Sequence, residues 1–132
     1  MPFRIGILHS TIRKEEKLLI EAAKKRNVQV KLIDIRKEIF DPRNYSPNVD
    51  LVLDRSVSTI KGLQALLFFE SLGILTVNKY SVASLAVDKF ATSLALFKKG
   101  VPIPKFALVF SEEEALKAVE QLGGFPVVIK PT

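Results

Sequence analysis

Four short segments rich in β-forming residues alternate with helix-like segments along residues 1–78, and this alternation constrains the fold most. The apolar segments span residues 3–8, 28–35, 49–53 and 74–77. Between them, residues 12–26 and 59–72 carry apolar side chains at helical spacing, while residues 36–48 form a polar loop. Strands that alternate with helices pair in parallel through right-handed crossovers. We therefore expect an α/β fold with a small, doubly wound parallel sheet, in which residues 28–35 lie near an edge.

A different pattern begins after residue 78. Residues 81–99 have a helical pattern throughout, and we expect a break near Asp88, whose carboxylate is able to cap the second piece. Residues 100–104 have the sequence GVPIP and should end that helix. Glycine adopts the left-handed conformation of a helix end, and the two prolines cannot continue a helix.

The last part of the chain predicts a helix between two strands. Residues 106–110 and 125–130 are apolar and are expected to be strands. Ser111 and Glu114 have the spacing of a capping box, which predicts the start of the helix between these strands, and Gly123 should end it. We place a domain boundary between residues 78 and 79, so that the predicted domains cover residues 1–78 and 79–132.

The composition excludes several kinds of chemistry. The 132 residues include no Cys and a single His, so disulfides, cysteine nucleophiles and most zinc sites are excluded, and we predict no metal site within the chain. Charged residues interrupt every apolar run before the roughly 18 residues that a membrane span needs. We expect a cytoplasmic protein with no membrane partner. Scarce Met, Asn and Gln beside plentiful Lys, Glu and Ile favour a thermophilic source.

Positive charge concentrates at the beginning of the chain. The formal net charge is +6, and residues 1–43 hold 11 Lys+Arg against 6 Asp+Glu. Within the predicted helix, the basic side chains of residues 13–26 are Arg13, Lys14, Lys17, Lys24, Lys25 and Arg26. This pattern is typical of a solvated helix face, and it also fits a surface that attracts an acidic partner. Nucleic acid is disfavoured because both tyrosines lie outside this segment and no RNA-binding signature occurs.

Two turns that follow predicted strands carry side chains suited to binding. Parallel sheets bind ligands at the carboxyl ends of their strands, where helix amino ends and free backbone amides converge. His9 follows the first strand, and Arg55, Ser56 and Ser58 follow the third. We predict these four residues as substrate contacts, with Arg55 offering a planar fork for a carboxylate. The alternative is structural: His9 is a surface residue and Ser58 an ordinary helix cap. The first turn lacks the three spaced glycines of a dinucleotide site.

Two lysines stand out in the second half of the chain. Lys89 begins a predicted helix directly after Asp88, and Lys130 closes an apolar segment directly before Pro131. A lysine at the end of a buried strand either reaches solvent with its ammonium group or meets an anion, such as a phosphate, that offsets the cost of desolvation. The residues alone leave both readings open.

Three segments around these lysines closely resemble the ATP-grasp ligases, and they follow one another along the chain in the order found in that family. They are residues 88–90 (DKF), 96–105 (LFKKGVPIPK) and 124–131 (GFPVVIKP). In that family a DK-type lysine begins the central domain, a GxPxP stretch follows the helix, and a second lysine ends an FPVVIKP-type strand. Both lysines contact ATP phosphates, and the resemblance implies this role for Lys89 and Lys130. Residues 4–8 and 13–19 further resemble the LysX ligases of lysine biosynthesis, and the chain is also similar to arginine-pathway and RimK-type glutamate ligases.

The resemblance implies a Rossmann-like pre-ATP-grasp domain over residues 1–78, followed by the first part of an ATP-grasp domain. The implied enzyme uses ATP and Mg²⁺ to activate a carboxylate and joins α-aminoadipate or glutamate to the terminal glutamate of a small acidic carrier protein. The basic segment 13–26 is the expected contact with that carrier, and homo-oligomer formation stays open. Which amino acid is the substrate also stays open.

The family's glycine-rich loop belongs directly after residue 131, and its magnesium ligands lie further on. We therefore expect the chain to be a fragment or truncated product with little catalysis of its own and no catalytic residue. The alternative function is a non-catalytic Rossmann-like module that binds an anion or a protein. A nucleic-acid binder is a third interpretation, which depends on the net charge alone.

Overall fold

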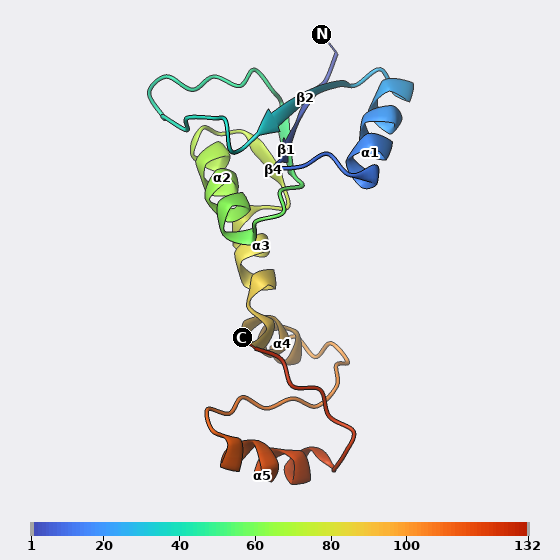
Figure 1. Cartoon of the computed structure of the whole chain (residues 1–132), viewed down its shortest axis with the longest axis vertical. Coiled ribbons are helices and arrows are strands. Elements are labelled where there is room, and N and C mark those ends of the chain that lie inside the picture. Colours follow the sequence, from blue (N-terminus) through green and yellow to red (C-terminus); the bar gives the residue numbers. More distant parts are fainter. Residues whose placement is uncertain (1, 132) are drawn as a thin grey trace. The chain divides into compact units, whose positions relative to one another are not determined.

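The computed structural model describes residues 2–131 and contains two compact units, one ending at Ser84 and one beginning at Leu85 (Figure 1). The first unit holds the sheet, which comprises β1 (Arg4–His9), β2 (Gln29–Asp34), β3 (Leu51–Asp54) and β4 (Leu75–Val77). All three pairs of neighbouring strands are parallel, in the order β2-β1-β3-β4. The predicted α/β class and the edge position of the second strand are both confirmed. Among the described residues, no helix combines the length and apolar character that a membrane crossing needs.

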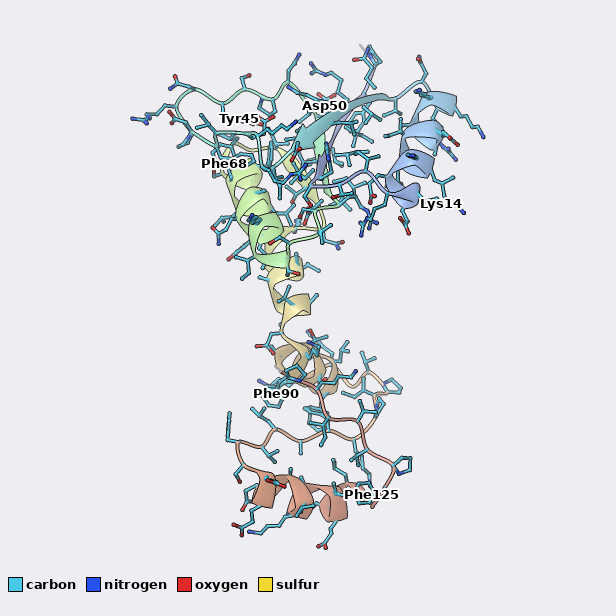
Figure 2. The ribbon with its side chains drawn as sticks, in the orientation of Figure 1. Lys14, Tyr45, Asp50, Phe68, Phe90 and Phe125 are labelled. Atoms are coloured by element: carbon cyan, nitrogen blue, oxygen red, sulfur yellow. The ribbon has the colours of Figure 1, made fainter. Side chains whose placement is uncertain are left out.

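Two helices flank this sheet from opposite sides, α1 (Lys14–Lys25) and α2 (Thr59–Ser71) (Figure 1). The expected capping at the start of α2 is present, because Ser58 accepts a hydrogen bond from the Lys61 amide at 3.4 Å. Its carboxyl end is followed by Gly73, whose φ of +75° is a conformation that glycine adopts without strain. The loop between β2 and β3 folds back over α2, where the ring of Tyr45 lies 5.5 Å from that of Phe68 (Figure 2).

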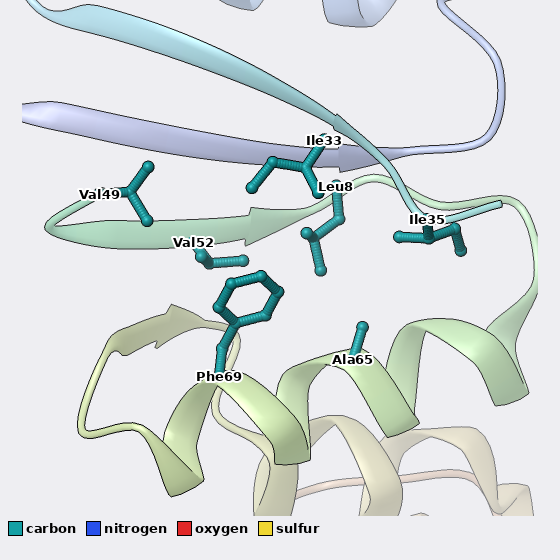
Figure 3. Packing of buried hydrophobic residues seen from close by; sticks show 7 residues of the cluster. All are labelled: Leu8, Ile33, Ile35, Val49, Val52, Ala65 and Phe69. Carbon is teal, nitrogen blue, oxygen red and sulfur yellow. The ribbon is translucent and has the colours of Figure 1, made fainter. Parts of the chain in front are cut away.

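The core of the first unit lies between the sheet and α2. Leu8, Ile33 and Val52 come from three neighbouring strands and point toward the same face (Figure 3). Phe69 of α2 packs against them and is completely buried. Gly6 leaves room for this packing, since a Cβ atom there would lie only 3.0 Å from the Ile33 side chain. This core fixes the strand register and therefore the position of every turn at the sheet's carboxyl edge.

The helix that continues into the second unit breaks where the sequence predicted. α3 (Tyr80–Val87) ends just before Asp88, and α4 (Lys89–Lys98) begins just after it. The Asp88 carboxylate accepts a hydrogen bond from the Ala91 amide at 2.8 Å, which confirms it as the cap of α4. Gly100 follows with a φ of +69°, in agreement with the expected helix end.

The predicted strands over residues 106–110 and 125–130 are wrong. Both segments are irregular, and no backbone ladder joins them in the described part of the chain. A strand needs a hydrogen-bonded neighbour, and an apolar pattern does not reveal whether one is present. Phe110 is 93% exposed and Phe125 is 77% exposed, so these apolar segments are also poorly covered.

The helix between these segments is present as α5 (Glu112–Leu122). Ser111 accepts a hydrogen bond from the Glu114 amide at 3.3 Å, which is one half of the predicted capping box. The Glu114 carboxylate contacts Lys117 at 2.8 Å. Gly123 ends the helix in the left-handed conformation, as expected.

Candidate functional site

The carboxyl edge of the sheet gathers the four predicted substrate contacts of the first unit. β1 ends at His9, and the turn that holds Arg55, Ser56 and Ser58 begins directly after β3. β1 and β3 are neighbours, and the chain connects them by way of β2 on the far side of β1. This arrangement makes the gap between their carboxyl ends the topological switch point of the sheet, which is where open α/β sheets bind ligands.

Arg55 is engaged by a carboxylate of the chain itself. Its Nε donates to Glu16 at 2.9 Å, and the Glu16 side chain is completely buried. Arg13 binds the same carboxylate through its backbone amide at 2.8 Å and through its guanidinium at 3.0 and 3.1 Å. The hydrogen bond from the Arg13 side chain is the main reason that the pKa of Glu16 falls to about 2. This network joins the start of α1 to the turn after β3.

The serines of the two turns also have partners within the chain. Ser56 donates to the Asp54 carboxylate through its amide at 2.9 Å and through its hydroxyl at 2.7 Å. Ser58 caps α2, as described above. The Ser10 hydroxyl accepts from the Val57 amide at 3.2 Å and so ties the turn after β1 to the turn after β3. The edge is therefore ordered by its own hydrogen bonds before any ligand arrives.

His9 differs from its neighbours because one of its ring nitrogens has no hydrogen-bond partner among the described residues. Its Nδ1 atom is buried, and it is the one buried side-chain nitrogen or oxygen in the described residues with no hydrogen-bond partner. Asp34, which is paired with His9 in register across β1 and β2, is bound by Arg36 at 2.8 and 2.9 Å. That hydrogen-bonded arginine holds the pKa of Asp34 well below its usual range. A buried polar atom without a partner costs free energy, and a bound ligand or water would remove that cost.

A second candidate site lies in the second unit, where Lys89 and Lys130 line the same cleft of about 790 Å³. The walls come from α4, from residues 103–108 and from residues 122–131. Phe106 is held against α4, with its ring 6.0 Å from that of Phe90 and 6.2 Å from that of Phe97. Phe90 is marked on α4 in Figure 2. The aromatic contacts position the irregular segment that carries one wall of the cleft.

The cleft offers cations and apolar surface. Three of its lining residues are lysines, and none of the described residues that line it is Asp or Glu. Across residues 2–131, no group of three or more His, Asp or Glu side chains lies close enough to hold a metal ion. The chemistry of this lining fits phosphates and does not fit a metal. The magnesium ligands expected beyond the chain therefore stay a prediction.

A smaller cavity of about 200 Å³ lies at the opposite edge of the sheet, near the amino ends of β1 and β2. Its cations are occupied by the chain. Arg4 pairs with Asp50 at 3.1 Å, and Lys31 donates to the Pro47 carbonyl at 2.9 Å. This cavity contains none of the predicted site residues.

Two features of these sites escaped sequence reasoning. Lys105 lines the cleft beside Lys89 and Lys130, although only the other two lysines were predicted there. Its position directly after a Pro-Ile-Pro stretch is the signal that could have found it. Glu16 belongs to the segment 13–26, whose charge pattern is typical of a solvated helix face, yet it is buried between two arginines. The Arg13–Glu16 spacing at a helix start was the available signal for that pair.

The comparisons with known proteins agree on one family. The family model described as the LysX preATP-grasp domain matches residues 5–85. The chain is 34% identical over 128 residues to a glutamate–LysW ligase, ArgX, from Sulfolobus acidocaldarius, covering 97% of this chain and 45% of that protein. It is 32% identical over 131 residues to an alpha-aminoadipate–LysW ligase, LysX, from Sulfurisphaera tokodaii, covering 96% and 46%.

A solved structure supports the same relationship. A RimK domain ATP-grasp protein from Sphaerobacter thermophilus has a TM-score of 0.74 and 29% sequence identity, over 91% of this chain and 46% of that one. The chain spans about half the length of the curated relatives it matches.

The buried Glu16 network makes a prediction about stability and pH. The ordinary pKa of this carboxyl is 4.5, and it falls to about 2 in the folded chain, so the unfolded chain takes up the proton first as pH decreases. The stability that Glu16 contributes is present above pH 4.5 and is lost as pH falls toward 2. We expect urea unfolding to give Glu16→Gln a lower free energy of unfolding than the original chain at pH 6, with a difference that stays constant down to about pH 4.5 and narrows from there to pH 2.5.

The control replaces Glu21, an exposed carboxylate on the same helix. The Glu21→Gln variant should have the same dependence of its free energy of unfolding on pH as the original chain. If the free energies of unfolding of Glu16→Gln and the original chain change in parallel with pH, the proposed contribution of the Glu16 network to stability is wrong.

Proposed function

Because the chain belongs to the LysX preATP-grasp family, we propose that it forms the amino-terminal portion of an ATP-dependent ligase that joins a carboxylate to an amine. The proposed reaction links glutamate or α-aminoadipate to the terminal glutamate of a LysW-type carrier protein, in arginine or lysine biosynthesis. One observation carries the proposal. Lys89 and Lys130 are far apart in the sequence, yet both line one cleft that lacks carboxylates among its described residues.

The two lysines act by charge and position. The chemistry supplied by ATP in such a ligase is activation of a carboxylate as an acyl phosphate, from which an amine then displaces phosphate. Lys89 and Lys130 bind the phosphates and hold them in place, and their fixed cations stabilise the charge that develops on the phosphoryl oxygens. Neither lysine needs to gain or lose a proton. Phe106 and Val127 supply apolar wall to the cleft, and both lysines are exposed where a phosphate can reach them.

The carboxyl edge of the sheet is the proposed place for the amino acid or the carrier's terminal glutamate. His9 brings a buried ring nitrogen that has a free bonding position within the described chain. Ser56 lies in the turn after β3, and Arg55 and Ser58 order that turn while remaining candidates for direct contact. We propose these four residues as substrate contacts of the first unit.

The outer face of α1 is the proposed contact with the acidic carrier. Lys14, Lys17, Lys24 and Lys25 are exposed and recur at the spacing of a single helix face, with Lys14 marked on the outer side of α1 in Figure 2. Glu16 points the other way and is bound by two arginines, so it does not reduce the charge of this face. Opposite charge on a partner would speed encounter from a distance.

We propose a cytoplasmic location and a thermophilic source on the grounds given by the sequence. The formation of a homo-oligomer stays an open prediction.

Removing either cleft lysine tests the nucleotide site. Isothermal titration calorimetry with ATP should show Lys89→Gln and Lys130→Gln each weakening the affinity by roughly 10- to 100-fold, since a hydrogen bond to a charged group contributes about 1.5–3 kcal/mol. Lys117 is the control, because it pairs with Glu113 and Glu114 and does not line the cleft. Lys117→Gln should bind ATP within about twofold of the original chain.

Two outcomes would count against the proposal. Equal ATP affinity in all four proteins would remove the lysines from the site. An original chain that binds no ATP would favour the alternative of a non-catalytic module.

The carrier contact is tested by reversing charge on α1. Association of a LysW protein with the Lys24→Glu/Lys25→Glu variant should be about tenfold slower than with the original chain at low ionic strength, and the two rates should converge at about 0.5 M salt because screening shortens the attraction. Stopped-flow fluorescence measures both rates. Lys117→Glu provides a charge reversal in the other unit and should leave association unchanged. Identical rates for the double variant and the original chain at low salt would disprove the contact.

A further inference from the structure

The cleft of the second unit holds a third cation that neither the sequence nor the comparisons assign. Lys105 lines it together with Lys89 and Lys130. The three lysines come from three different stretches: the first turn of α4, the irregular segment after Pro104, and the end of the chain before Pro131. Their convergence follows from folding and is not a run of neighbouring charges.

Three of the five acidic side chains of this unit are used elsewhere. Asp88 caps α4, and Glu113 and Glu114 both bind Lys117, at 2.9 and 2.8 Å. Lys117 is therefore the lysine of this unit that forms ion pairs with acidic side chains. Within the described residues, the three cleft lysines have no ion pair and no side-chain hydrogen bond. Like charges gathered in one cleft repel each other, and an anionic ligand would relieve that repulsion.

Lys105 and Lys89 each stand next to a ring of one aromatic contact. Lys105 lies between Pro104, whose ring restricts the backbone, and Phe106. Phe106 packs on Phe90 with 6.0 Å between ring centroids, and Phe90 directly follows Lys89. Each lysine is thus the immediate neighbour of one ring in the same aromatic contact. Phe97 adds a second ring contact to Phe106 from the other end of α4.

We infer that Lys105 is a third phosphate-binding residue of this cleft and that it makes the site selective for a nucleoside triphosphate over ligands with fewer phosphates. The inference rests on the proposed nucleotide site and adds to it a third residue that distinguishes ligands by their number of phosphates. Two lysines leave part of a triphosphate's negative charge uncompensated, whereas a monophosphate has no charge left for a third ammonium group to bind. The contribution of Lys105 should therefore grow with the number of phosphates.

Calorimetric titration of the whole chain with ATP, ADP and AMP measures this dependence directly. Lys105→Gln should weaken ATP binding about tenfold, ADP binding by less, and AMP binding by less than twofold. Lys105→Arg keeps the cation and should retain most of the ATP affinity. Lys98 lies on α4 outside the cleft, and Lys98→Gln should match the original chain with all three nucleotides.

The outcomes separate this inference from the function it rests on. If ATP affinity depends on Lys89 and Lys130 and is unchanged in Lys105→Gln, the third contact is wrong and the nucleotide site stands. If Lys105→Gln weakens the binding of ATP, ADP and AMP equally, the contribution of the lysine does not depend on the number of phosphates, and the proposed selectivity is wrong. If the original chain binds none of the three nucleotides, both proposals fail. Far-UV circular dichroism of each variant confirms that it is folded.

Discussion

The buried carboxylate of Glu16 organises the carboxyl edge of the sheet in the first unit. It is bound by Arg13 at the start of α1 and by Arg55 in the turn after β3, so a single side chain connects two elements that the sequence separates widely. Burying a carboxylate is costly unless its oxygens are paired, and here both are. The same burial has an effect on the outside. With Glu16 turned inward, the exposed charged residues of α1 are four lysines and two glutamates, so its surface keeps a net positive charge.

The second unit presents the opposite electrostatic situation. Three lysines line its cleft, and none of the cleft's described residues carries a negative charge. The walls are held by packing of Phe106 on Phe90 and Phe97 and not by a sheet. The first unit is thus charge-compensated at its buried edge, whereas the three lysines of the second unit's cleft have no ion pair among the described residues. This contrast is the physical basis for assigning phosphate binding to the cleft and a different role to the sheet edge.

The sequence allowed prediction of features that depend on local patterns. Parallel strands, the edge position of β2, the break at Asp88 and the helix end at Gly123 all follow from spacing and capping chemistry. The strands expected over 106–110 and 125–130 failed because pairing depends on a partner that an apolar pattern does not reveal. Lys105 and Glu16 were missed for a related reason. Whether a charged side chain faces solvent, a cleft or the core is set by contacts between distant residues.

In the proposed nucleotide site, two ammonium groups that are distant in the sequence share one triphosphate. A crystal structure of the chain with a non-hydrolysable ATP analogue tests it most directly. The account predicts phosphate oxygens within hydrogen-bond distance, about 3 Å, of Nζ in both Lys89 and Lys130. An analogue bound with its phosphates at the carboxyl edge of the sheet, or in contact with only one of these lysines, would contradict it.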